Sequence, residues 1–134
     1  LLETRRCAVL VDGFFEWFKD GGRKRPFFVT RSDKRPLLLA SLYDVWVNEQ
    51  RSERIVSFTV ITTDVSQALG WLHDRMPAVL EGESLDAWLG NGSVPFCDPR
   101  IQKVLQPLSE GLEWVEVGDR VSQIKNNDAD CLLP

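Results

Sequence analysis

The chain has 134 residues, of which 43% are apolar and 27% charged, as is typical of one soluble globular domain with a single core. Its net charge of −4 gives no overall argument for nucleic-acid binding, although the stretch from Arg23 to Arg35 is locally basic. No signal peptide and no apolar run of membrane-spanning length is present, so we expect an intracellular protein.

The first half of the chain predicts strands. Short apolar or β-branched runs bounded by turn residues indicate buried strands, and Asp20-Gly21-Gly22 is typical of a hairpin turn between two of them. The expected strands are Cys7–Val11, Phe14–Lys19, Pro26–Thr30, Leu37–Leu42 and Val56–Thr62. The basic stretch around the third strand is expected mainly as a solvated loop and strand edge, with a local positive face as the alternative.

The second half predicts three helices and a late strand. Capping residues precede apolar positions at helical spacing in Asp64–Leu72 and Asp98–Leu105, and Glu83–Leu89 places its apolar residues on one helical face. Leu112–Val117 indicates a further strand. Strands outnumber helices and do not alternate with them. We therefore expect an α+β fold built on a mostly antiparallel sheet or partial β-barrel, with a few short helices, in one domain spanning residues 1–134.

The three cysteines favour neither a disulfide framework nor a zinc site. Cys7, Cys97 and Cys131 are odd in number, far apart and form no CxxC pair. Cys7 has apolar neighbours and is expected to be a buried structural thiol. The carboxylates after Asp64 lack metal-site spacing, so we expect no metal, and no phosphate loop, HExxH or nucleophile elbow is present.

Glu16 is the unusual residue of the stretch DGFFEWFKDGG. In a strand, Phe14, Glu16 and Phe18 share one face while Phe15 and Trp17 share the other. If the face of Glu16 is solvated, Glu16 is an ordinary surface acid. If that face lines a cleft, aromatic walls desolvate the carboxylate and suit it to acid–base catalysis.

His73 is the only histidine, within WLHDRMPAVL. Imidazole is well matched to proton transfer near neutral pH, but a lone histidine at a helix end is more often a capping or packing residue. Arg75 is of the type that grips phosphate, and Pro77 is expected to end the helical region and stiffen the turn. The pattern suits a phosphate-bearing substrate.

These segments together resemble one family over the whole chain. RRCAVLVDGFFEWFK, PFFV, LLLASLYDVW, FTVITTDVSQALGWLHDRMPAVL and VSQIKNNDADCLLP follow in the order found in the SRAP (SOS response-associated peptidase) family. Members of that family shield abasic DNA sites and include a protein that binds 5-hydroxymethylcytosine DNA. The resemblance implies an SRAP-like fold, no cofactor, and a role in the DNA damage response.

The resemblance also implies a reaction. An N-terminal cysteine, exposed by self-processing, forms a Schiff base and then a thiazolidine with the aldehyde of an abasic site in single-stranded DNA. The family's motifs assign catalysis to Glu16 and His73, a backbone contact to Arg75, the DNA-facing cleft to Trp17 and a phosphate contact to Thr62. We also expect a monomer, located in the nucleus of a eukaryote or in the cytoplasm and nucleoid of a bacterium.

One departure from the family pattern leaves the function open. The family's N-terminal cysteine, and the asparagine, arginine and WGL loop that follow it, have no counterpart here, and Cys7 matches a strand position instead. We therefore expect an SRAP-like domain that lacks its N-terminal segment. The alternatives are a non-catalytic single-stranded-DNA-binding or interaction module, and a degenerate fragment that is unstable alone.

Overall fold

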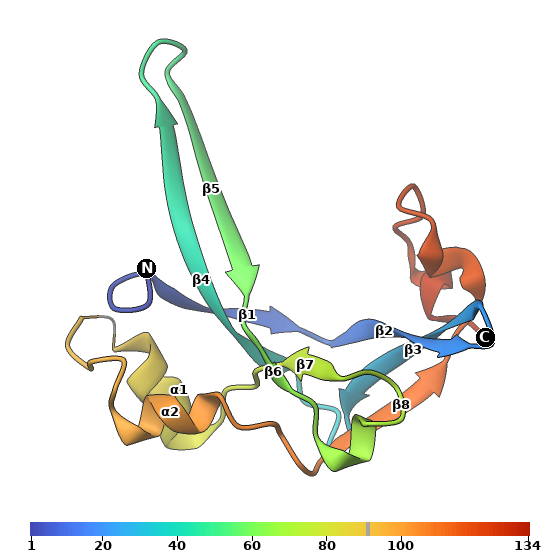
Figure 1. The fold of residues 1–134 in the computed structure, drawn as a ribbon. Helices are drawn as coiled ribbons and strands as arrows, with labels where there is room; N and C mark the ends of the chain where they lie inside the picture. Colours follow the sequence, from blue (N-terminus) through green and yellow to red (C-terminus); the bar gives the residue numbers. More distant parts are fainter. Residues whose placement is uncertain (91) are drawn as a thin grey trace.

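A computed structural model describes residues 1–90 and 92–134. The described residues form three antiparallel sheets, ordered β1-β4-β5, β2-β3-β8 and β6-β7, together with two α-helices and three 3₁₀ turns. Figure 1 shows these elements, whose bounds are β1 Arg6–Val11, β2 Gly13–Asp20, β3 Arg23–Arg31, β4 Leu37–Asn48, β5 Glu53–Val60, β6 Thr62–Asp64, η1 Gln67–Leu69, β7 Arg75–Pro77, α1 Gly82–Leu89, α2 Pro99–Val104, β8 Leu112–Glu116, η2 Asp119–Ser122 and η3 Ala129–Leu132. The predicted α+β class is confirmed, and the sheets stay open rather than closing into a barrel.

Strands β1 and β2 run as one line through the molecule and link the two larger sheets (Figure 1). The chain changes sheet at Gly13. A Cβ on Gly13 would lie 2.4 Å from the carbonyl oxygen of Val29, so only glycine fits this close backbone approach. The glycine therefore allows β2 to pair with β3 directly after β1 has paired with β4.

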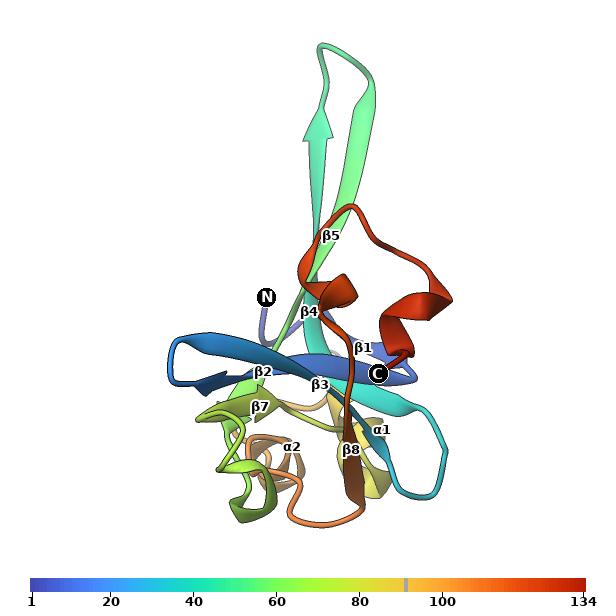
Figure 2. The ribbon, with the colours of Figure 1, turned by 90° about the vertical axis from the view of Figure 1, so that its right-hand side faces the viewer.

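The β4–β5 hairpin is longer than predicted and projects from the body (Figures 1 and 2). The first half of β4 is buried between β1 and the helices. The apolar run Leu37–Leu42 predicted this part of the strand correctly. The outer part of the hairpin is largely exposed, with Trp46 of β4 and both Ile55 and Phe58 of β5 open to solvent. The strand predicted from the sequence ends at Leu42, because the exposed residues beyond it do not form the apolar run that indicates a buried strand.

The predicted helix over Asp64–Leu72 is wrong. That segment begins at the last residue of β6 and contains only the short 3₁₀ turn Gln67–Leu69, and Arg75–Pro77 is strand β7 rather than a helix end. The backbone N–H of Val65 donates to the carbonyl of Asp74 at 3.1 Å, which closes a loop between the two strands. Leu69 and Leu72 are buried as their apolar character requires, but a loop places them in the core.

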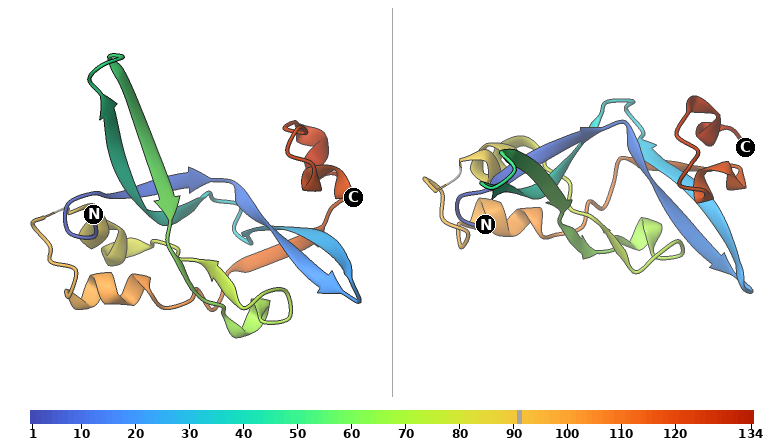
Figure 3. Two further views of the ribbon diagram at one scale, coloured as in Figure 1. Left: turned by 45° about the horizontal axis from the view of Figure 1, so that its top comes forward. Right: turned by 90° about the horizontal axis from the view of Figure 1, so that it is seen from above.

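Helices α1 and α2 and strand β8 form close to the predicted bounds. Asp98 caps α2 by accepting from the N–H of Arg100 at 2.9 Å, as its position before a proline predicts. The two helices pack on the buried half of β4 around Trp88 and Ile101, both without solvent exposure. Figure 3 shows this helical layer at one end of the molecule and the tip of the β2–β3 hairpin at the other.

Arg6, at the start of β1, is a buried arginine. It is 1% exposed, and its guanidinium donates to the carbonyls of Trp88, Leu2 and Val94 at 2.7–2.8 Å. These bonds join β1 to the C-terminal end of α1 and to the loop beyond it. A buried guanidinium is tolerated because carbonyl oxygens accept its hydrogens.

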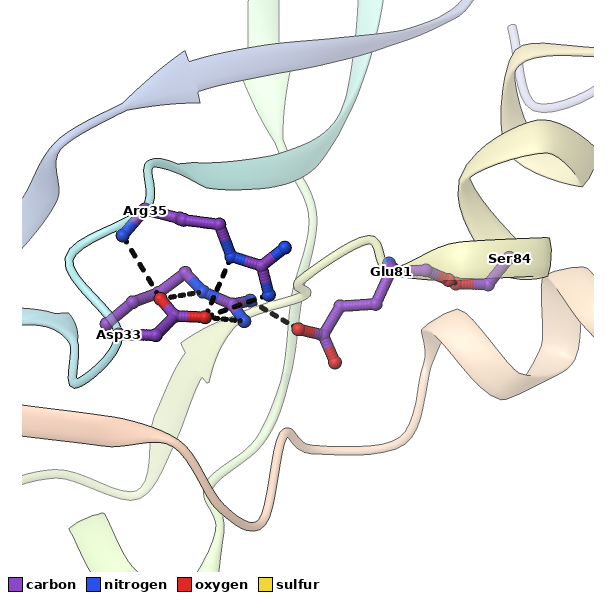
Figure 4. A network of polar contacts seen from close by, with 5 residues as sticks. Asp33, Arg35, Glu81 and Ser84 are labelled. Carbon is purple, nitrogen blue, oxygen red and sulfur yellow. Dashed lines mark hydrogen bonds and ion pairs between the residues drawn. The ribbon is translucent and has the colours of Figure 1, made fainter.

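Most of the cations between Arg23 and Arg35 are paired rather than free. Arg31, 14% exposed, donates to both carboxylate oxygens of Asp33 at 2.9 Å and also bonds Glu81 at the start of α1. Arg35 donates to Asp33 as well. We call Arg31, Asp33, Arg35 and Glu81 the Arg31 network; Figure 4 shows it, with Ser84 beyond it in α1. The network ties the β3–β4 loop to α1.

Candidate active site

Strand β2 places Glu16 on the packed face of its sheet. Phe14 and Phe18, which share that face, pack against the core cluster that contains Leu69 and Met76. The side chain of Glu16 lies between them and is 24% exposed. Of the two interpretations of DGFFEWFKDGG, this geometry is the one in which the face of Glu16 lines a hollow.

The carboxylate of Glu16 also caps the open edge of the sheet. Among the described strands, β2 pairs only with β3, so alternate backbone groups of β2 face outward. The outward N–H of Trp17 donates to Oε1 of Glu16 at 3.0 Å. This bond holds the carboxylate at the strand edge, where its second oxygen stays available to a ligand.

His73 lies opposite Glu16. Its Nε2 is 3.9 Å from Oε1 of Glu16, and its side chain is 37% exposed. Nδ1 accepts the backbone N–H of Arg75 at 3.1 Å, so in the neutral ring the hydrogen is on Nε2 and faces Glu16. Nδ1 also lies 3.0 Å from a carboxylate oxygen of Asp74.

The gap between Glu16 and His73 has the size of one polar atom. A separation of 3.9 Å is too long for a direct hydrogen bond, whereas an oxygen placed between them can lie about 2.8 Å from each. One group accepts a hydrogen and the other donates one. The pair can therefore remove a proton from a substrate and return one at the same place.

A hollow of about 430 Å³ surrounds this pair. Its lining side chains come from β2, from the start of β3, from the loop before β7 and from η2, and they are Glu16, Trp17, Lys19, Lys24, His73 and Ser122. The indole Nε1–H of Trp17 donates to the hydroxyl of Ser122 at 2.9 Å and so fixes the tryptophan against η2. Because β2 is an edge strand, the hollow reaches side chains on both of its faces.

Sequence analysis missed three residues of this hollow. Lys19 and Lys24 lie symmetrically about a turn centred on Gly21 and Gly22, so the turn signal alone could have placed them opposite each other. Ser122 carried no signal, because it is joined to Trp17 only through the tertiary fold.

Arg75 and Thr62 lie together on the β6–β7 pair. Arg75 begins β7, two residues after His73, and Thr62 begins β6. The guanidinium of Arg75 donates to Asp64 and to the carbonyl of Thr62, each at 2.7 Å, and to the Thr62 hydroxyl at 3.2 Å. Arg75 remains 47% exposed. The structure thus brings two predicted DNA contacts together, and it gives the arginine an acidic neighbour that a phosphate would have to compete with.

The cysteines do not contribute to the hollow. All three are free, and partial burial raises the pKa of the Cys7 thiol, which makes it a weak nucleophile. Cys7 is half-buried rather than fully buried as expected. Within residues 1–90 and 92–134, no three His, Cys, Asp or Glu side chains are grouped so that they could hold a metal ion, and no helix has the length and apolar character to cross a membrane.

Comparison with known proteins matches residues 1–124 to the family model SOS response associated peptidase (SRAP). The chain is 34% identical to the abasic site processing protein HMCES of Xenopus tropicalis over 98% of this chain and 44% of that protein. It is 35% identical to the abasic site processing protein YMR114C of Saccharomyces cerevisiae over 98% of this chain and 36% of that protein.

A crystal structure of a protein from Bacteroides thetaiotaomicron has a similar fold. It superposes with a TM-score of 0.83 at 28% identity, over 98% of this chain and 57% of the other. The chain thus spans less than half the length of the two curated relatives named above.

Proposed function

Because the chain belongs to the SOS response-associated peptidase (SRAP) family, we propose that the whole protein is an abasic-site sensor that crosslinks itself covalently to abasic sites in single-stranded DNA. Glu16 and His73 are the acid–base pair of this reaction. The observation that carries the proposal is their opposed placement, 3.9 Å apart, in a hollow on the edge of β2.

The reaction needs proton transfer at each step. The amine of an N-terminal cysteine of the whole protein attacks C1′ of the ring-opened abasic sugar, and the carbinolamine loses water to give a Schiff base. The thiol then adds to the imine carbon while the imine nitrogen gains a proton, which closes a thiazolidine. One water is released overall, and no oxidant or reductant is consumed.

Each member of the pair has a role in this sequence. The N–H of His73 Nε2 donates to the sugar oxygen as the ring opens, and Glu16 accepts the proton released at C1′. Glu16 then carries protons during loss of water and ring closure, and during self-removal of the residue that precedes the cysteine. Cys7 is not the nucleophile, because it lies within β1 and its pKa is raised.

The remaining predicted residues bind the DNA. Arg75 and Thr62 contact the sugar–phosphate backbone beside the reacting sugar, and Trp17 forms the wall of the hollow. Single-strand binding requires local cationic and aromatic groups, so a net charge of −4 is compatible with it.

The test incubates the whole protein with three single-stranded oligonucleotides: one with a true abasic site, one with the tetrahydrofuran analogue that lacks an aldehyde, and one undamaged. We expect an adduct that survives heating and denaturing electrophoresis with the true abasic site alone. Binding of all three oligonucleotides without any adduct would overturn the proposed crosslinking activity and favour a non-catalytic binding module. A duplex carrying the same abasic site tests the preference for single strands.

A further inference from the structure

The tip of the β2–β3 hairpin holds two like charges directly opposite each other. Lys19 and Lys24 are partners in the β2–β3 register, and both are exposed. Opposed like charges on neighbouring strands are unfavourable, because their side chains leave the same face of the ribbon a few ångströms apart. The hairpin therefore carries an electrostatic cost at this position.

The other cations of this hairpin have acidic partners. Arg25 donates to both oxygens of Glu116 at 2.8 and 2.5 Å, and Arg23 lies 3.7 Å from Asp119. Neither Lys19 nor Lys24 forms an ion pair within the part of the chain that the structure describes. The acids near the tip, including Asp20, are instead engaged by the arginines. The two ammonium groups are thus left to a ligand.

These two lysines line the same hollow as Glu16 and His73. Trp17 and Lys19 share one face of β2, and Lys24 joins them from β3, so the hollow has a cationic wall beside its acid–base pair. When a DNA strand places its sugar between Glu16 and His73, the backbone next to that sugar lies beside the two lysines.

We propose that Lys19 and Lys24 form a subsite for the DNA backbone phosphate that flanks the abasic nucleotide; this inference rests on the proposed function. A phosphodiester between the two ammonium groups cancels their repulsion and accepts hydrogens from both. Lysine binds phosphate as a compact charge without reading the base, which suits a site whose substrate has lost its base. The subsite positions the sugar and takes no part in the chemistry.

The test measures binding of the full chain to a fluorescein-labelled oligothymidine with one tetrahydrofuran site, by anisotropy over a range of salt concentrations. Each phosphate contact to a single strand contributes about 0.7 to the slope of log affinity against log salt. Because the two lysines share one phosphate, Lys19→Gln with Lys24→Gln should flatten the slope by about 0.7. The matched control, Lys34→Gln with Lys103→Gln, removes the same charge outside the hollow and should leave most of the slope intact.

A second arm locates the phosphate. Oligonucleotides with one neutral methylphosphonate at each position around the tetrahydrofuran should bind the wild-type chain more weakly when the flanking phosphate is replaced. The lysine double variant should not distinguish that oligonucleotide from its charged parent. The unfolding temperature of the lysine double variant should equal or exceed that of the wild type, because the repulsion between Lys19 and Lys24 is removed.

The outcomes separate this inference from the proposed function. An unchanged salt slope in the lysine variant overturns the phosphate subsite, even if the whole protein still forms the abasic adduct. A flattened slope equal to that of the control pair overturns it too, since the effect is then one of overall charge. A flattened slope specific to the lysine pair supports the subsite, even if no adduct forms and the crosslinking function is withdrawn.

Discussion

The Arg31 network and the Glu16–His73 pair both bring charged or polar residues together from distant parts of the chain, but they differ in how completely their hydrogen bonds are made. In the network, Asp33 accepts hydrogen bonds from Arg31 and Arg35, and Glu81 accepts a further hydrogen bond from Arg31 (Figure 4). In the pair, the facing atoms stay 3.9 Å apart, and the lysines beside them have opposed like charges.

This difference separates a structural role from a functional one. A closed network leaves few positions for a ligand, and its geometry is already satisfied within the folded chain. An open pair with unused donors and acceptors in a hollow gains its missing bonds only when something binds. We therefore expect mutations in the two regions to act on different measurements.

The largest effect is expected in the open pair. Glu16→Gln in the whole protein should slow adduct formation with abasic single-stranded DNA by about 100-fold or more, because the amide cannot exchange the proton. Binding of the tetrahydrofuran oligonucleotide and the unfolding temperature should change little. Quenched time points on denaturing gels give the rate, and Glu53→Gln on β5 is the matched control. Unchanged kinetics would remove Glu16 from the mechanism.

A smaller effect is expected from two arginines that each bond a carboxylate. Arg31→Met should lower the free energy of unfolding by about 2 kcal/mol, because it breaks several charge-assisted bonds of a side chain that is only 14% exposed. Arg75→Met should cost less than about 1 kcal/mol, since Arg75 is 47% exposed, but it should weaken single-strand binding and flatten its salt dependence.

Urea unfolding and anisotropy together test this contrast between the arginines. If Arg75→Met destabilises the chain as much as Arg31→Met and leaves the salt slope in place, Arg75 is structural, and its assignment as a phosphate contact is wrong.

The smallest effect is a pH dependence that belongs to the closed network. The guanidinium of Arg31 holds the pKa of Asp33 well below its usual range. The unfolded chain then binds a proton at higher pH than the folded chain, so this stabilisation is complete above pH about 4 and is lost as the pH falls through the folded value. Asp98, whose pKa the guanidinium of Arg100 lowers to about 2, acts in the same direction.

Thermal unfolding between neutral pH and pH about 2 measures this dependence. Asp33→Asn should make the unfolding temperature less sensitive to acid. The control is Asp86→Asn, on an exposed part of α1 outside the network, which should keep the acid sensitivity of the wild type. Equal acid sensitivity of the Asp33 variant and the wild type would show that the network does not stabilise the folded chain through this carboxylate.

Local patterns predicted those parts of the fold whose burial is regular along the chain. The sequence predicts the strands before Leu42 because short apolar runs end at turn residues, and it predicts helices α1 and α2 because their apolar residues have helical spacing. The segment after Asp64 was predicted wrongly as a helix. Its apolar residues have helical spacing, but pairing of β6 with β7 determines their conformation. The outer half of the β4–β5 hairpin was missed because its residues are exposed.

The sequence by itself determined the family and the identity of the candidate residues. DGFFEW and HDRMP are local motifs, and a strand must place Glu16 on the face of Phe14 and Phe18 because its side chains alternate. The tertiary structure alone decided that this face is packed, that His73 turns its Nε2 toward Glu16, and that Arg6 is buried while Lys19 and Lys24 stay without acidic partners in the described chain. Periodicity is a property of neighbours along the chain, whereas burial and pairing depend on segments that meet only when the chain folds.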